Sequence, residues 1–243
     1  VGAARGGVLA PGTPVGGVSQ AVWGDRWWQW AMSYPEGQNP LTDVTGAFSG
    51  LGDQGPLFFL AGTISGPANR VATVREGQTL FIPIVPVVSS IGLFGANEPA
   101  VREDAAATMG AASGLFLTVD GSPVSLPPSA PSLLDFYQTT PPGTFPLTFV
   151  ENNIYSSFGV PAGTYESVSV GYWVMLEGLS AGRHTVHFGG HFSGTPALNY
   201  APFDTDITYT LNVEPVPEPS AIALAGIAGL IMAAGRACRR RHA

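Results

Sequence analysis

The sequence predicts a mainly β protein: a β-sandwich or jelly-roll-like single domain with an N-terminal amphipathic helix and a C-terminal transmembrane helix. Short apolar runs, split by glycine and proline, indicate the strands, and the chain of 243 residues holds 32 glycines and 22 prolines. A cluster of tryptophans near the N-terminus follows helical spacing instead. Seventeen uncharged residues, 219–235, precede a basic C-terminus and indicate the membrane span.

Residues 1–18 are expected to be a flexible N-terminal segment. They contain six glycines, two prolines and one charge, so they offer little apolar surface to bury. An exported protein carries an N-terminal signal, and we expect that it was cleaved or omitted here, because the sequence begins at Val1.

A helix is predicted to follow Ser19, which is a suitable N-cap, and to end before Pro35. One face carries four apolar residues at spacings of three and four: Trp23, Trp27, Trp30 and Ala31. Trp28 lies off this stripe. The tryptophans suit either a sugar-binding platform or a buried core, and we favour the core, because aromatic stripes at helical spacing are usually buried.

Strands are predicted at residues 57–63, 70–74, 79–85, 115–119, 168–177, 183–189 and 206–213. Residues 98–109 are predicted to form a short helix with Pro99 in its first turn. The glycine-bearing segment 178–182 is predicted to be the loop of a hairpin that joins the two strands around it. These elements belong to one exported β-sandwich domain, residues 19–213.

Seven prolines between Gly121 and Pro146 argue against central strands there and predict a long surface excursion. Phe136, Tyr137 and Phe145 in this excursion could bind a ligand or hold the segment against the body of the domain. We favour the second interpretation.

The charge balance excludes one class of partner. Through Val216 the chain carries six arginines and sixteen acidic residues, a net charge of −10, and it contains no lysine. Such a surface repels nucleic-acid phosphates, so no nucleic-acid partner is expected. The single cysteine, Cys238, lies in the tail, so the exported domain can form no disulfide.

The C-terminus is predicted to divide into a proline-rich stalk (214–220), a transmembrane helix (221–235) and a basic cytoplasmic tail (236–243). As a helix, the uncharged run spans roughly 25 Å, just long enough for a bilayer core. A basic cluster marks the cytoplasmic end, and it consists of Arg236, Arg239, Arg240 and Arg241. A buried core helix is the alternative, but such a cluster at the extreme terminus argues against it.

The three C-terminal parts, in this order, resemble the PEP-CTERM sorting signal of Gram-negative bacteria. The resemblance implies export through the inner membrane and anchoring by the helix until an exosortase, a membrane protease, recognises Pro217, Glu218 and Pro219 and removes helix and tail. It also implies a mature protein at the cell surface or in the extracellular matrix, associated with biofilm polysaccharide. Segments of residues 19–213 resemble uncharacterised secreted bacterial proteins, which implies a shared fold and no particular activity.

Histidines form the densest group of candidate metal ligands. Of the three between residues 184 and 191, only His187 and His191 share a strand face, and we expect Gly189 and Gly190 to break that strand between them. They are therefore weak metal candidates. No cofactor motif, serine-nucleophile elbow or phosphate-binding glycine loop is present, and none of the residues is predicted to be catalytic.

The function that best fits these observations is an exported, non-catalytic structural or binding module. Its expected partners are an exosortase, the membrane before processing, and extracellular polysaccharide. A secreted carbohydrate-active hydrolase is the alternative, because the carboxylates are numerous enough for a glycosidase pair.

Overall fold

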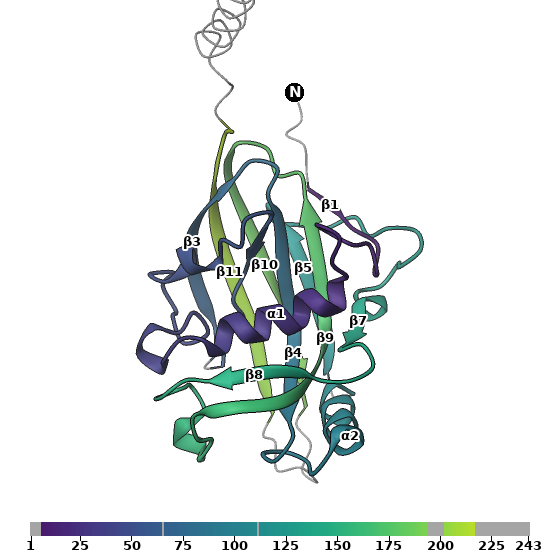
Figure 1. The fold of residues 1–243 in the computed structure, drawn as a ribbon. Helices are drawn as coiled ribbons and strands as arrows, with labels where there is room; N and C mark the ends of the chain where they lie inside the picture. The colour runs from purple at the N-terminus through teal and green to yellow at the C-terminus, as the bar shows by residue number, and fades with distance from the viewer. Residues whose placement is uncertain (1–5, 65, 111, 194–201, 217–243) are drawn as a thin grey trace, which may run out of the picture.

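The computed structural model describes residues 6–64, 66–110, 112–193 and 202–216, and in them the chain is mainly β, with two sheets (Figure 1). This part of the predicted fold class is confirmed. One sheet contains β1 (Gly7–Val8), β9 (Gly163–Glu177), β4 (Thr79–Ser90) and β2 (Leu57–Phe59) in that order, with β7 (Tyr137–Thr139) and β8 (Phe145–Phe149) also paired to β9. The other has the order β3 (Ala68–Arg75), β11 (Phe203–Glu214), β10 (Gly182–Phe192), β5 (Ala112–Val119) and β6 (Ser122–Pro123).

The pairing within the sheets is mostly antiparallel. Two pairs are parallel: β2 with β4, and β3 with β11. The predicted hairpin between β9 and β10 is wrong, because these strands belong to different sheets. Residues 178–182 therefore carry the chain from one sheet to the other. A glycine-bearing segment of this length fits either connection, and the strand pattern does not say which sheet a strand joins.

Helix α1 (Gln20–Met32) begins and ends as predicted. The Ser19 hydroxyl accepts a hydrogen bond from the N–H of Val22 (3.3 Å). The helix lies across the sheet that contains β4, β9 and β8 (Figure 1). Gly24 lets it approach closely, since a Cβ there would lie 2.9 Å from the Trp173 ring of β9.

The predicted tryptophan stripe is buried, which confirms the core interpretation. The exposed fractions are 7% for Trp23, 1% for Trp27 and 7% for Trp30. Trp28 lies off the predicted stripe, yet it is buried as well, with only 4% of it exposed. Helical spacing alone therefore identified one buried face of the helix and missed the burial of Trp28.

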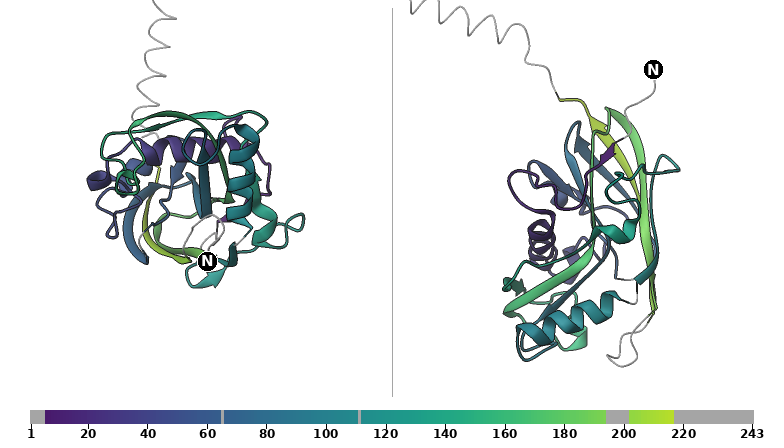
Figure 2. Two further views of the ribbon diagram at one scale, coloured as in Figure 1. Left: turned by 90° about the horizontal axis from the view of Figure 1, so that it is seen from below. Right: turned by 90° about the vertical axis from the view of Figure 1, so that its right-hand side faces the viewer.

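Helix α2 (Glu98–Met109) matches the predicted range. Asn97 caps it by accepting from the N–H of Ala100 (3.0 Å), and Glu98 pairs with Arg102 one turn later (2.8 Å). The helix contacts β4 and β9 and closes one end of the molecule (Figure 2). Four short 3₁₀ helices complete the described elements: Glu36–Gln38, Ser49–Gly52, Leu133–Phe136 and Ser156–Phe158.

Two hydrophobic clusters are buried in the molecule. The inter-sheet core is mostly aliphatic and draws residues from both sheets and from α2, among them Ile82, Val174, Phe188 and Leu211. The helix core lies between α1 and the outer side of the β4–β9 sheet and is rich in aromatic residues. Alternation along the two-sided strands explains why one sheet contributes to both clusters.

The N-terminal segment differs from the flexible tether that composition suggested. Gly7 and Val8 form β1 against Glu177 and Leu176 of β9, and the N–H of Leu9 donates to the carbonyl of Met175 (3.0 Å). A Cβ at Gly6 would collide with the Glu177 carbonyl. The small residues that predicted flexibility thus permit close approach to a sheet edge.

The proline-rich excursion contains no central strand: each of β6, β7 and β8 pairs with a single neighbour among the described strands. Phe136 (0% exposed) and Phe145 (7%) hold it against the body of the domain, as favoured. Tyr137 is 41% exposed and packs edge-on against Tyr172.

The predicted stalk is described only as far as Val216. The sorting motif, the apolar run 221–235 and the basic cluster lie outside the described residues. Within the described ranges, none of the helices has the length and apolar character needed to cross a bilayer.

Candidate ligand-binding cavity

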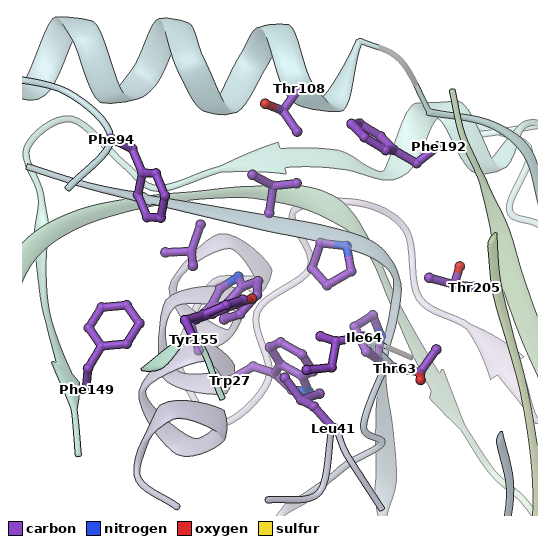
Figure 3. A pocket seen from close by; sticks show the side chains of 16 residues that line it. Trp27, Leu41, Thr63, Ile64, Phe94, Thr108, Phe149, Tyr155, Phe192 and Thr205 are labelled. Atoms are coloured by element: carbon purple, nitrogen blue, oxygen red, sulfur yellow. The ribbon is translucent and has the colours of Figure 1, made fainter. Parts of the chain in front are cut away.

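An apolar cavity of about 230 Å³ lies between α1, β4 and α2 (Figure 3). Its wall consists of Trp27, Trp28, Leu41, Gly62, Thr63, Ile64, Pro83, Pro86, Val87, Val88, Phe94, Thr108, Phe149, Tyr155, Phe192 and Thr205. None of these lining residues is charged. For comparison, a cavity of about 150 Å³ is enough to hold benzene in a protein interior.

The path of β4 accounts for the space. Strand β2 pairs only with Thr79–Phe81, so farther along β4 this edge has no neighbour among the described strands. Pro83 and Pro86 then follow, and the register against β9 shifts between Pro83 and Val85. Prolines have no N–H and suit such edges and bulges. The strand therefore forms an apolar wall rather than a paired edge.

A buried arginine holds the opposite wall in place. Arg70 of β3 is 2% exposed, and its guanidinium donates to the backbone carbonyls of Asp43 (2.6 Å), Ala61 (2.6 Å) and Gly62 (2.8 Å). The Tyr209 hydroxyl also accepts from it (3.1 Å). These bonds order residues 61–62, directly before Thr63 and Ile64, which line the cavity.

The four tryptophans of α1 differ in how their indole N–H groups are used. Trp23 donates to the carbonyl of Val15 (3.0 Å), Trp27 to that of Leu60 (2.8 Å) and Trp30 to that of Leu51 (2.8 Å). Trp28 lines the cavity, and its Nε1 is buried without a hydrogen-bond partner among the described residues. Buried donors are rarely left unpaired, so an acceptor from outside the described chain would complete the hydrogen bonding of this group.

A second unpaired polar atom borders the same cavity. Thr108, in the last turn of α2, is 3% exposed, and its Oγ1 has no partner in the described chain. Figure 3 shows this side chain beneath α2, on the side of the cavity away from Trp27 and Leu41. Two helices that are distant in sequence thus each bring one unsatisfied polar group to one apolar space.

Two large apolar side chains of the lining are also exposed at the surface. Ile64 is 42% exposed and Phe94 is 39% exposed. A residue that both lines a cavity and contacts solvent marks where the cavity opens. Exposed aliphatic and aromatic groups at an opening favour entry of an apolar molecule.

A buried carboxylate lies elsewhere on α1. Asp25 is 6% exposed, and its Oδ1 accepts from the hydroxyls of Thr140 (2.6 Å) and Ser169 (2.7 Å). Burial raises the pKa of Asp25 to about 6, against the opposing effects of these two hydrogen bonds and of the Arg102 charge. It ties α1 to β9 and is absent from the cavity lining.

The structure changes the picture of the two candidate metal ligands. Strand β10 continues through Gly189 and Gly190, so the predicted break is wrong; only the register against β5 shifts there. The strand continues because Gly189 and Gly190 pair with β11 in unbroken register, and the local sequence does not show this pairing. His187 contacts Asp206 (2.7 Å) and His191 contacts Asp204 (2.7 Å). Among the described residues no three potential ligands gather around one point.

His184, Asp120 and Ser180 have the composition of a hydrolytic triad but a different geometry. Asp120 Oδ2 lies 2.9 Å from Nδ1 of the ring. Nε2, however, lies 3.0 Å from the Ser180 carbonyl oxygen and 3.5 Å from the Ser180 hydroxyl. The carbonyl, and not the hydroxyl, is the nearer partner, so the ring does not present a free base to this serine. The contacts join the 178–182 connection to the β5–β6 turn.

Some cavity residues were recognisable in the sequence, although apolar periodicity did not select them. Trp28 stands outside the stripe yet is a large apolar residue, and two prolines interrupt an apolar run at 83 and 86. Thr108 carries no such signal, since its importance depends on what α2 covers. The sorting motif and the basic cluster lie outside the described residues, so the structure does not relate them to the cavity.

No protein-family model and no curated protein matches the chain. Among solved structures, the solution structure of amebosin is similar at a TM-score of 0.19 and 11% identity, over 61% of this chain and 96% of amebosin. A TM-score this low supports no inference about fold or function.

Proposed function

We propose that the protein is an exported, non-catalytic binding module whose site is the cavity between α1, β4 and α2. The observation that carries the proposal is the pair of buried, unpaired polar groups, Trp28 Nε1 and Thr108 Oγ1, among the residues of a mainly apolar wall. Unsatisfied buried groups cost about 1–3 kcal/mol each, and a ligand that pairs with them recovers part of this free energy.

The lining favours binding over catalysis. General acid–base chemistry and glycoside hydrolysis need carboxylates, histidines or similar groups beside the substrate. Tyr155 is the titratable residue in the described lining, and no carboxylate or histidine accompanies it. The alternative of a secreted carbohydrate-active hydrolase therefore receives no support from this site.

Delivery rests on the C-terminal resemblance. We propose that Pro217, Glu218 and Pro219 direct an exosortase to remove the apolar helix and the tail, leaving the domain at the surface or in the matrix of a Gram-negative bacterium. The described end of β11 and strand β1 lie at the end of the molecule away from α2 (Figures 1 and 2). A tether beyond Val216 would leave the α2 end free.

We also propose that the domain is a β-sandwich and not a jelly roll. The inter-sheet core, which takes residues from both sheets, supports two facing layers. The parallel pairs β2–β4 and β3–β11 disfavour a jelly roll, in which consecutive strands form antiparallel Greek keys.

A cavity-filling variant tests the binding proposal. Small neutral fragments should bind the full chain saturably in calorimetry, and Val88→Phe, which fills the cavity, should abolish binding while the protein stays folded. Val71→Phe is the matched control, because Val71 is 53% exposed on β3 and is not part of the lining. A wild-type protein that binds none of the fragments would refute the proposal.

Processing is tested separately by mass spectrometry of the mature surface protein from its host. The proposal expects a C-terminus within or directly after the sorting motif. A mature protein that still carries residues 221–243 would overturn it.

A further inference from the structure

The cavity wall also restricts the chemistry of its ligand, an inference that rests on the proposed binding function. An indole N–H is a donor and never an acceptor. A ligand that pairs with the unpaired Trp28 Nε1 must therefore carry a hydrogen-bond acceptor. The Thr108 hydroxyl can donate or accept, so it pairs with a second polar atom of either kind.

Charge is excluded by the same wall. None of the described lining residues is charged, and bringing an ion out of water without a partner costs several kcal/mol. The net charge of −10 through Val216 adds long-range repulsion for anions. The ligand is therefore neutral.

Size and polarity exclude a sugar. A monosaccharide ring carries several hydroxyls, each of which needs a partner when it is buried. Most of the described lining is aliphatic or aromatic, including Phe149, Phe192 and the two prolines of β4. At about 230 Å³ the space is half as large again as one that holds benzene.

We propose that the cavity binds a small, neutral, mainly apolar molecule, such as an aromatic or short acyl ketone, ester or ether, whose oxygen accepts from Trp28 Nε1. The acyl or aromatic part then packs against the side chains of β4. Polysaccharide, the partner expected from the sorting signal, would have to contact another surface.

Two probes of nearly equal shape test this: acetophenone, which carries a carbonyl acceptor, and ethylbenzene, which does not. Trp28→Phe keeps an aromatic ring but removes the donor. In calorimetry with the full chain, this variant should reduce the affinity for acetophenone about three- to tenfold more than the affinity for ethylbenzene. This is the range expected for one net hydrogen bond. Comparing the two probes cancels the change in cavity size, which affects both.

Trp23→Phe is the matched control. It removes an indole N–H that already bonds to Val15 and lies outside the lining, so it should leave the affinity ratio of the two probes unchanged. Benzoate, an anion of similar size, and methyl glucoside should bind far more weakly than acetophenone.

The outcomes separate the two proposals. One outcome is that both probes bind the wild-type protein and lose binding in Val88→Phe, while Trp28→Phe leaves the ratio of their affinities unchanged. In that case the binding site stands and the assigned ligand class is wrong. Benzoate or methyl glucoside binding as tightly as acetophenone would also overturn the class. If no probe binds, the binding function itself fails, and the inference fails with it.

Discussion

The two hydrophobic cores of this molecule are built differently. The inter-sheet core is filled mainly by aliphatic side chains that alternate along paired strands, such as Val174 on β9 and Leu211 on β11. The helix core is built from indole and phenyl rings that meet edge-to-face; Trp27 alone contacts Trp28, Trp30 and Trp173. Each indole ring can also be held by a hydrogen bond from its N–H.

The cavity takes more of its lining from the helix core than from the inter-sheet core. Small branched side chains adjust to fill space between two sheets, whereas rigid rings with one fixed polar atom leave gaps where their edges diverge. Three of the helix tryptophans are anchored by carbonyls from segments before and after α1, and the fourth, Trp28, lines the cavity and has an N–H with no partner in the described chain. The aromatic core thus provides stability and a site, while the aliphatic core provides stability alone.

The largest expected effect is on Trp27. Replacing it by alanine removes a ring that is 1% exposed and frees the Leu60 carbonyl, so Trp27→Ala should lower the free energy of unfolding by about 3–5 kcal/mol. Denaturant midpoints measure this. A loss below about 1 kcal/mol would mean that the helix core contributes little to folding.

The next effect depends on pH and arises where α1 meets β9. Because the pKa of Asp25 is raised to about 6 in the folded protein from an unfolded value near 3.8, folding favours its protonated form. The wild-type free energy of unfolding should therefore fall by about 3 kcal/mol in all as the pH rises from below about 3 to above about 7, and about 2 kcal/mol of this falls between about pH 4 and about pH 6.

Asp25→Asn is the control for this prediction, because it removes the titrating group and keeps the shape of the protonated acid. Urea unfolding at several pH values should give a flatter profile for the variant over this window. Equal slopes for the two proteins would contradict the role of Asp25.

A pair of leucines sharpens the comparison between the cores. Leu211, 0% exposed, is enclosed in the inter-sheet core, whereas Leu41, 2% exposed, already borders the cavity. Leu211→Ala should cost about 2–5 kcal/mol, and Leu41→Ala should fall at or below the lower end of this range, since fewer neighbours are lost. Equal losses in thermal unfolding would show that the cavity wall is packed as tightly as the other core.

The smallest expected effect on stability is that of Trp28→Phe. Its indole N–H makes no bond within the described chain, so the variant loses packing but no hydrogen bond. Trp23→Phe loses packing and also the bond to Val15. We expect Trp28→Phe to lower the free energy of unfolding by about 1 kcal/mol less than Trp23→Phe does, as measured by denaturant unfolding. The reverse order would indicate that Trp28 has a partner.

The positions of the helices and strands could be predicted from local sequence patterns. The ranges of both helices followed from Ser19, Pro35 and Pro99, because caps, breakers and first-turn prolines act within a few residues. The seven predicted strands each overlap an observed strand, because apolar runs split by glycine and proline are also local patterns. The wrong assignments, the 178–182 hairpin and the break at Gly189, both concern which strand lies beside which.

By itself, then, the sequence determined a mainly β chain, its two α-helices and a buried tryptophan face, since these depend on spacing along the chain. Only the tertiary structure decided that Trp28 is buried, that Thr108 faces the same space, and that Arg70 orders the wall opposite β4. The physical reason is that a cavity forms where side chains from segments distant in sequence do not pack against one another. Residues 28, 83 and 108 are brought together by sheet register and helix placement, and no local periodicity records the space left between them.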